Sequence, residues 1–72
     1  MGEPNNTPPP WSEAPPWAKY RAQDRNGSWF WYSEKPIEKE DIFDSGGKIS
    51  LCKWSSDNPN WKTTLQKRPE NE

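Results

Sequence analysis

The sequence predicts a small, mainly β protein: a three- to four-stranded antiparallel sheet with an extended proline-rich N-terminal arm and a possible short C-terminal helix. Two strand-like segments flank a turn sequence, Asp24-Arg25-Asn26-Gly27, which is typical of a β-hairpin. A third segment, residues 48–54, alternates apolar and polar side chains. With 72 residues, of which 28% are hydrophobic, the chain can form only one domain with a small core.

The N-terminal arm comprises residues 1–16, which are polar and rich in proline. It contains a short imperfect repeat, Pro8-Pro9-Pro10-Trp11 and Pro15-Pro16-Trp17. Because proline interrupts helices and sheets alike, we expect this segment to be disordered or extended in a polyproline II conformation. The single β domain is then expected over residues 17–66.

The hairpin is predicted from residues 18–23 and 28–34. Asp at the first turn position and Gly at the last favour a type I turn closed by a left-handed glycine, Gly27. The second strand ends before Pro36, because proline cannot continue the hydrogen-bonded ladder.

Two registers are possible for this hairpin. A two-residue turn at Asn26 and Gly27 would pair Ala22 with Trp31, whereas a three-residue loop pairs Ala22 with Phe30. We favour the longer loop because it separates apolar from polar residues, and a slip of one residue would mix the two faces. In that register one face holds Ala18, Tyr20, Ala22, Phe30 and Tyr32, and the other holds Lys19, Arg21, Gln23, Trp29 and Trp31.

Residues 37–47 are predicted as an acidic linker with two apolar anchors, Ile42 and Phe43. Its carboxylates match no calcium-loop spacing and lack a partner nucleophile, so a solvated acidic loop is the expected structure. These carboxylates are Glu38, Glu40, Asp41 and Asp44.

The alternation in residues 48–54 predicts a third antiparallel strand. We expect Ile49 and Leu51 to join the core face of the sheet, because side chains two residues apart point to the same side. The same rule places Trp54 on the other face, beside the two tryptophans of the hairpin.

The C-terminal region leaves its secondary structure open. Residues 59–66 could form a short helix capped by Asp57 or Asn58, or a fourth strand. Residues 67–72 are expected to be a disordered tail.

Composition excludes several classes of protein. The net charge is −1 with interleaved signs, which is unlike a general DNA-binding protein. A single cysteine, Cys52, and no histidine exclude an intramolecular disulfide, a Cys/His metal site within one chain and a Cys–His nucleophile. No segment resembles a signal peptide or a membrane span. We therefore expect a cytoplasmic protein that is not an enzyme and needs no cofactor.

The candidate binding residues are aromatic and basic. Trp29 and Trp31 are flanked by cationic side chains on the same predicted face, and large rings beside cations favour stacking and cation–π contacts. A glycine pair before Lys48 resembles a phosphate cradle only weakly. The full candidate set is Lys19, Arg21, Trp29, Trp31, Lys48 and Trp54.

Three interpretations of this face remain open. The proline-rich arm could cover the tryptophans within the same chain. A planar ligand such as a nucleotide could stack on them. Alternatively, a protein partner could dock there, since Trp, Tyr and Arg are enriched at binding hot spots.

Residues 16–34 resemble the first two strands of a WW domain. The resemblance rests on Trp17, on Asn26-Gly27 and on the aromatic run 29–32, and it implies a surface that grips proline-rich peptides. Two features differ: Ser33-Glu34 stands where the family has Asn-His, and the family's second signature tryptophan, followed by proline, is absent.

Residues 17–70 resemble small accessory proteins of tailed phages. The resemblance is carried by Ala-Lys-Tyr-Arg-Ala at 18–22, Asp-x-Asn-Gly-Ser-Trp-x-Trp-Tyr at 24–32, Lys-Pro at 35–36, and Asn-Pro-Asn-Trp-Lys-x-x-Leu-x-Lys-Arg-Pro-Glu at 58–70. It implies the cytoplasm of a host cell and no assigned activity. On this basis we expect an inhibitor that binds a host protein or defence complex. The alternative is a homo-oligomeric sponge that sequesters a signalling nucleotide.

Overall fold

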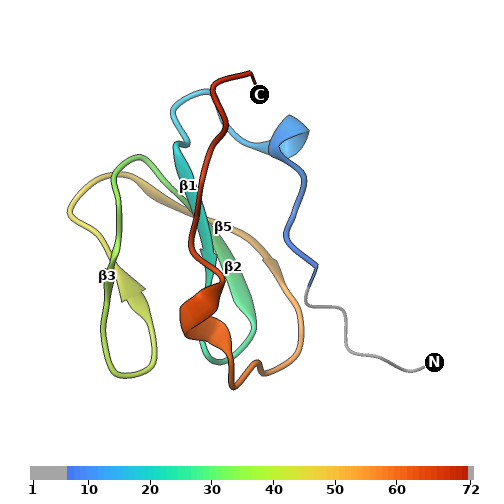
Figure 1. The fold of residues 1–72 in the computed structure, drawn as a ribbon, viewed down its shortest axis with the longest axis vertical. Coiled ribbons are helices and arrows are strands. Elements are labelled where there is room, and N and C mark those ends of the chain that lie inside the picture. Colours follow the sequence, from blue (N-terminus) through green and yellow to red (C-terminus); the bar gives the residue numbers. More distant parts are fainter. Residues whose placement is uncertain (1–6, 72) are drawn as a thin grey trace.

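A computed structural model describes residues 7–71; residues 1–6 of the predicted arm and residue 72 of the predicted tail lie outside this range. The described chain is mainly β, with a four-stranded antiparallel sheet, a two-stranded sheet and no α-helix (Figure 1). The predicted mainly β, antiparallel fold class is thereby confirmed. In chain order the elements are η1 (Trp11–Glu13), β1 (Tyr20–Gln23), β2 (Ser28–Tyr32), β3 (Ile37–Glu38), β4 (Phe43–Asp44), β5 (Ile49–Trp54), η2 (Trp61–Thr63) and β6 (Gln66–Lys67).

The β1–β2 hairpin has the register of the three-residue loop, with Ala22 opposite Phe30 and Gln23 opposite Trp29. This prediction is confirmed. Gly27 has the predicted left-handed conformation, with φ of 94°, and its N–H donates to the carbonyl of Asp24 at 2.9 Å. In the larger sheet the order is β5-β2-β1-β6, so the hairpin forms the centre.

A β-bulge interrupts the pairing of β5 with β2. The register shifts between Trp29 and Phe30, so that Cys52 is an extra residue on β5 and Trp54 lies opposite Ser28. Residues directly opposite each other share a face, so Trp54 lies on the face of Phe30. The prediction that Trp54 shares the side of Trp29 and Trp31 is therefore wrong.

Two hydrophobic clusters lie on opposite faces of the sheet. The Trp61 cluster lies on the predicted apolar face. In it the rings of Phe43 and Trp61 pack edge to face, with their centres 5.1 Å apart. It comprises Ala22, Tyr32, Phe43 and Trp61, with Tyr20, Phe30 and Leu65 packed against them. The Trp31 cluster comprises Trp11, Ala18 and Trp31, with Ala14, Trp17 and Cys52 packed against them.

Ala18 was predicted on the apolar face of the hairpin but belongs to the opposite cluster. It precedes β1, and its N–H donates to the carbonyl of Pro15 at 3.0 Å in a turn. The alternation of a strand does not extend into a turn, which is why the pattern failed at this position.

Ile49 and Leu51 occupy the predicted side of the sheet but not the core. They lie opposite Tyr32 and Phe30 respectively, yet remain 43% and 60% exposed. The Trp61 cluster covers this face over β1 and β2 and leaves it open over β5. The prediction that both residues join the core is therefore wrong.

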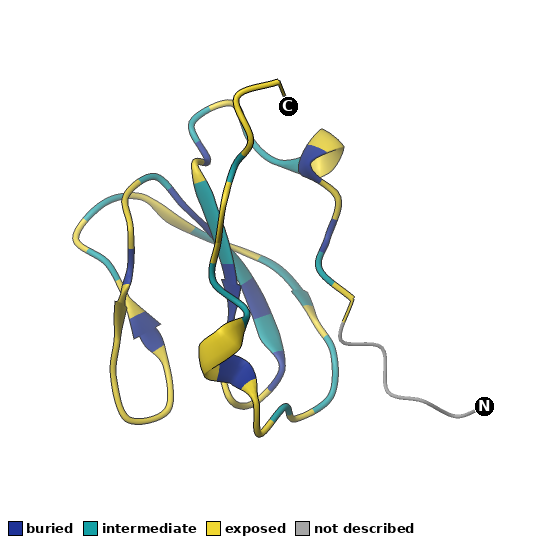
Figure 2. Ribbon diagram, in the orientation of Figure 1, coloured by how far each residue is buried: buried dark blue, intermediate teal, exposed yellow. Residues whose placement is uncertain are grey.

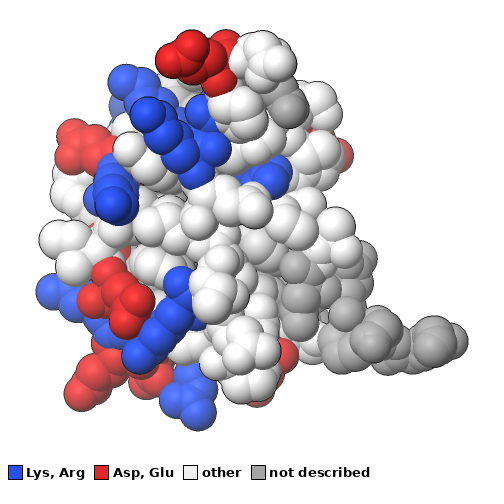
Figure 3. Space-filling model, in the orientation of Figure 1, with Lys and Arg blue, Asp and Glu red and all other residues white. Residues whose placement is uncertain are grey.

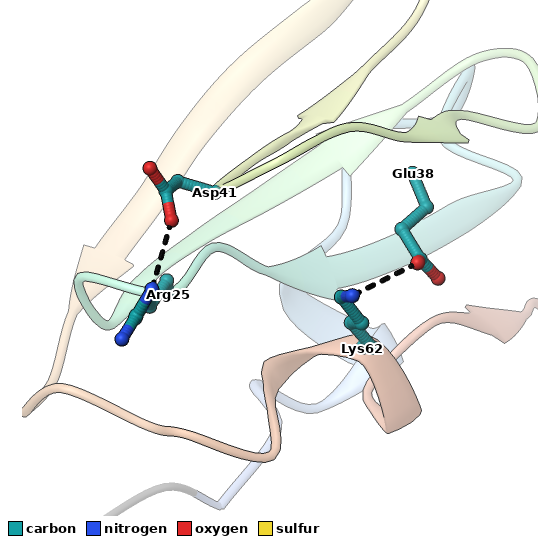
Figure 4. A network of polar contacts seen from close by, with 4 residues as sticks. All are labelled: Arg25, Glu38, Asp41 and Lys62. Atoms are coloured by element: carbon teal, nitrogen blue, oxygen red, sulfur yellow. Dashed lines mark hydrogen bonds and ion pairs between the residues drawn. The ribbon is translucent and has the colours of Figure 1, made fainter.

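The acidic linker forms a hairpin of β3 and β4 at one side of the sheet (Figure 1). Phe43 anchors it in the core, whereas Ile42, the second predicted anchor, is largely exposed. Two ion pairs tie the hairpin to the rest of the chain: Arg25–Asp41 at 3.0 Å and Lys62–Glu38 at 3.4 Å (Figure 4). Both pairs are exposed, so each contributes about 0–1 kcal/mol, and Phe43 supplies most of the attachment.

The C-terminal region matches neither of the two alternatives in full, because residues 59–65 hold one turn of 3-10 helix and the strand begins only at Gln66. A single turn of 3-10 helix, η2, follows Asn58, whose carbonyl accepts the N–H of Trp61 at 3.1 Å. The short strand β6 then pairs with β1, placing Lys67 opposite Tyr20. Pairing continues to Arg68, whose N–H donates to the carbonyl of Lys19 at 2.7 Å, beyond the point at which we expected the tail to begin.

Candidate functional site

The two central tryptophans of the predicted site are buried. Trp29 is 1% exposed and Trp31 is 3% exposed, and β2 as a whole consists of buried and intermediate residues (Figure 2). The arm covers Trp31: the ring of Trp11 lies 5.5 Å from it, tilted by 44°, and Pro9 is fully buried. Of the three interpretations, the structure matches coverage of Trp31 by the chain's own arm.

Arg21 holds this arm in place. Its guanidinium carbon lies 4.4 Å from the centre of the Trp11 ring, and its Nη1 donates to the carbonyl of Pro9 at 2.6 Å. The Nε atom donates to the side chain of Gln66 at 2.8 Å. Arg21 therefore joins the arm to the sheet and to β6 by a cation–π contact and charge-assisted hydrogen bonds.

The remaining predicted residues do not gather around these tryptophans. The Lys48 ammonium lies 5.7 Å from the Trp17 ring. Lys19 lines a separate cavity of about 520 Å³ with Lys67 and Arg68, in the region where basic side chains gather near the C-terminus in Figure 3. Of the predicted set, Arg21 and Trp31 lie together under the arm, as a cross-strand pair.

The exposed aromatic of the set is Trp54, which is 66% exposed and donates its indole N–H to the carbonyl of Asn26 at 2.7 Å. Leu51 and Ile49 lie on the same face of the sheet as Trp54, in the next two cross-strand pairs along β5. Phe30, half-buried, and Ile42 lie next to Ile49. We call Ile42, Ile49, Leu51 and Trp54, together with Phe30, the apolar strip.

A cavity of about 200 Å³ opens beside this strip, between the β3–β4 hairpin and the sheet. Ile42, Ile49, Phe30 and Phe43 form its apolar wall. The polar groups in its lining are those of Asp24, Tyr32 and Asp44. The strip and this cavity together form the candidate binding surface.

Asp24 is a buried carboxylate in the lining of this cavity. It is 7% exposed, and its Oδ1 accepts the backbone N–H of Phe43 at 2.9 Å, which fixes β4 against the hairpin turn. Burial raises the pKa of Asp24, and the Phe43 hydrogen bond opposes that rise. Burial also raises the pKa of Tyr32, with Asp24 and Asp44 adding to the rise, so both carboxylates act on the same phenol.

Asp24 should give the fold a pH dependence of defined sign. The native state binds its proton more tightly than the unfolded chain does, so the unfolding free energy should fall as pH rises from the ordinary value of 3.8 through the raised pKa. In Asp24→Asn, which keeps the acceptor for Phe43, this decline should flatten. Urea denaturation at a series of pH values measures it. Asp57→Asn, which removes an exposed carboxylate, should follow the wild type; a parallel Asp24→Asn profile would assign the decline to another group.

No group of three or more His, Cys, Asp and Glu side chains among residues 7–71 is placed to hold a metal ion. Burial and, to a smaller extent, Glu13 raise the pKa of the Cys52 thiol, which disfavours the nucleophilic thiolate. No helix in the described range has the length and apolar character to cross a bilayer.

Sequence reasoning missed most of the candidate surface. Ile49 and Leu51 were assigned to the core, and Asp24 was assigned only to a turn. The alternation of β5 did identify the side of the sheet on which Ile49 and Leu51 lie, but nothing in the sequence indicated that this side would stay uncovered. The burial of Asp24 depends on Phe43, which is 19 residues away in the chain.

Comparisons with protein-family models, with curated proteins and with solved structures found no significant match to this chain.

Proposed function

We propose that this chain is a non-enzymatic binding module that docks on another protein through the apolar strip. The observation that carries the proposal is the row of three large apolar side chains, Ile49, Leu51 and Trp54, left exposed on one sheet face. Contiguous exposed apolar side chains are costly to leave in water and mark interaction sites. Trp54 supplies an aromatic anchor of the kind enriched at binding hot spots.

The position of the strip also supports this proposal. β5 is the long edge strand of the four-stranded sheet, whereas the other edge, β6, has only two residues. A long edge strand offers both an apolar face and unpaired backbone groups to a partner. The bulge at Cys52 limits regular pairing at this edge to its first half, so we place the main contact on the side chains.

The docking surface differs from the aromatic and basic face expected from the sequence. A partner or nucleotide that stacks on Trp31 would first have to displace Trp11 and the contacts of Arg21 to the arm. The apolar strip requires no such displacement. The resemblance to phage accessory proteins favours a protein of the host cell, or a host defence complex, as the partner that would be inhibited.

Substitution of Leu51 with Asp should abolish this binding while the fold is retained. A central hot-spot residue contributes about 2 kcal/mol or more, which is about thirtyfold in affinity, and a charge there would also have to be desolvated. Wild type and variant would be immobilised, exposed to host lysate, and compared by quantitative mass spectrometry of the captured proteins. Circular dichroism would verify that the variant is folded, as expected for a residue that is 60% exposed.

Ile37→Asp is the matched control, because Ile37 is similarly exposed (65%) but lies on β3 and is not among the residues of the strip or of the cavity lining. It should leave capture unchanged. Equal capture by Leu51→Asp and wild type would contradict the proposal. So would native mass spectrometry that shows a homodimer lost in Leu51→Asp, because the strip would then join two copies of this chain.

A further inference from the structure

The outer edge of β5 carries backbone groups that no other described strand uses. The N–H of Ser33 donates to the carbonyl of Lys48 at 3.0 Å, so these two residues form a hydrogen-bonded pair of the antiparallel ladder. Such pairs alternate with pairs that are not hydrogen-bonded, which makes Ser50 the next β5 residue bonded to β2. Ile49 and Leu51 therefore direct their N–H and C=O groups away from β2, and no hydrogen bond among residues 7–71 reaches these groups.

The side chains of the same two residues complement a strand added at this edge. Ile49 and Leu51 are 43% and 60% exposed on one face of the sheet. Side chains of an added strand would lie directly opposite them, at the Cβ separation of about 4.5–5.5 Å that is typical of cross-strand pairs. The bulge at Cys52 interrupts the ladder, so regular pairing at the outer edge is confined to residues 48–51.

Two lysines flank this segment on the opposite face of the sheet. Lys53 lies opposite Trp29, and the Lys48 ammonium lies near the Trp17 ring, which packs against the Trp31 cluster. Neither lysine takes part in the ion pairs of the described chain. Lysines on an edge strand oppose its pairing with an identical strand, whereas they favour a strand that carries carboxylates at the neighbouring positions.

We infer that the partner contributes an extended segment that pairs antiparallel with residues 49–51 and alternates apolar with acidic side chains. The inference rests on the proposed function for the existence of the partner. The apolar side chains of the segment would cover Ile49 and Leu51, and its carboxylates would lie beside Lys48 and Lys53. Main-chain hydrogen bonds would then supply affinity, and the two sets of side chains would supply specificity.

A short peptide with this pattern tests the edge directly. Acetyl-Thr-Glu-Val-Thr-Val-Glu-Thr amide places two valines opposite Ile49 and Leu51, with a glutamate on each side. Isotope-labelled protein would be titrated with this peptide and followed by NMR. We expect saturable shifts of the Ile49 and Leu51 amide signals and, at saturation, hydrogen exchange slowed by at least about tenfold at both amides. The exchange of Ser50 should not change, because its N–H is already bonded to β2.

Two matched peptides separate the contributions of charge and backbone. Replacing both glutamates with lysine should weaken binding by at least about threefold, through the loss of exposed ion pairs. Methylating the backbone nitrogens of both valines retains every side chain but removes two hydrogen-bond donors, and should weaken binding by at least about tenfold. Equal binding of all three peptides, or the absence of shifts at Ile49 and Leu51 with the acidic peptide, would overturn the inference.

The protein variant that tests the charges is Lys53→Glu. It should weaken the acidic peptide by at least about threefold, and circular dichroism would verify that the variant is folded. Lys39→Glu is the matched control, because it makes the same change of charge at an exposed residue between β3 and β4, and it should leave binding unchanged. Equal weakening by both variants would show that net charge, rather than the β5 edge, selects the peptide, and would overturn the inference.

Failure of the inference can be distinguished from failure of the proposed function. If Leu51→Asp abolishes partner capture but the acidic peptide neither binds nor competes with the captured partner, the strip docks by its side chains alone and only the inference is overturned. If the peptide binds but Leu51→Asp captures as much as wild type does, the strand site is supported and the proposed function is overturned. Competition between the peptide and the captured partner supports both.

Discussion

Replacement of Trp11 with alanine is expected to destabilise the fold by about 3–5 kcal/mol, the usual cost of truncating a buried tryptophan. Trp11 is 5% exposed, lies against Trp31 and carries the guanidinium of Arg21 on its ring. Its loss would open the Trp31 cluster and expose one of the two cores. A chain of this size has a total stability of only about 4–11 kcal/mol, so the variant should approach or reach global unfolding.

Urea denaturation followed by far-ultraviolet circular dichroism measures this effect. Trp54→Ala is the matched control, because it removes the same side chain from a site that is 66% exposed, and it should cost no more than about 1 kcal/mol. A Trp11→Ala variant as stable as Trp54→Ala would show that the arm does not belong to the folded core in solution. The face that holds Trp29 and Trp31 would then be open to ligands, and a planar ligand could stack on it.

Replacement of Gly27 with alanine is the second change from which we expect a large effect. Gly27 has φ of 94°, a conformation that costs a residue with a Cβ about 1–3 kcal/mol. An added Cβ would also lie 2.6 Å from the carbonyl oxygen of Ser56 and 3.0 Å from the carbonyl carbon of Ser55. Because this oxygen and carbon belong to the backbone, the chain after β5 would have to move, at a further cost of about 1–3 kcal/mol.

A second glycine serves as a reference for the combined cost of strain and contact at Gly27. Gly46→Ala is the matched control, because a Cβ there meets nothing within 4 Å, and its stability should stay close to that of the wild type. Thermal unfolding of the two variants provides the comparison. A Gly27→Ala variant within about 1 kcal/mol of Gly46→Ala would mean that neither the left-handed conformation of Gly27 nor the close approach of Ser56 is maintained in solution.

The surroundings of Gly27 show how much of the fold the sequence allowed us to predict. The hairpin and its register followed from local chemistry, because Gly27 closes the turn and a slip of one residue would mix apolar with polar faces. The close approach of Ser56 to Gly27 could not be predicted, since it joins segments separated by the whole of β2 to β5. The bulge at Cys52 was also invisible, because alternation in β5 is unbroken in the sequence and the shift arises from how β5 meets β2.

The candidate site was predicted less well than the fold, for a related reason. The sequence identified aromatic and basic side chains suited to binding, but it did not indicate which of them the chain would use for itself. Trp31 and Arg21 are engaged by the arm. The apolar residues of β5, which resembled core residues, remain exposed because the Trp61 cluster covers only the neighbouring strands.

The sequence by itself determined the antiparallel β class, the central hairpin and the division of its side chains between two faces. All three depend on residues within one turn or two adjacent strands, where spacing alone dictates geometry. The tertiary structure decided which parts of each face are covered, and hence that Trp31 is core whereas Ile49, Leu51 and Trp54 are surface. Coverage depends on the arm, on Phe43 and on Trp61, segments distant in the chain, and burial is a property of the assembled fold rather than of any residue within it.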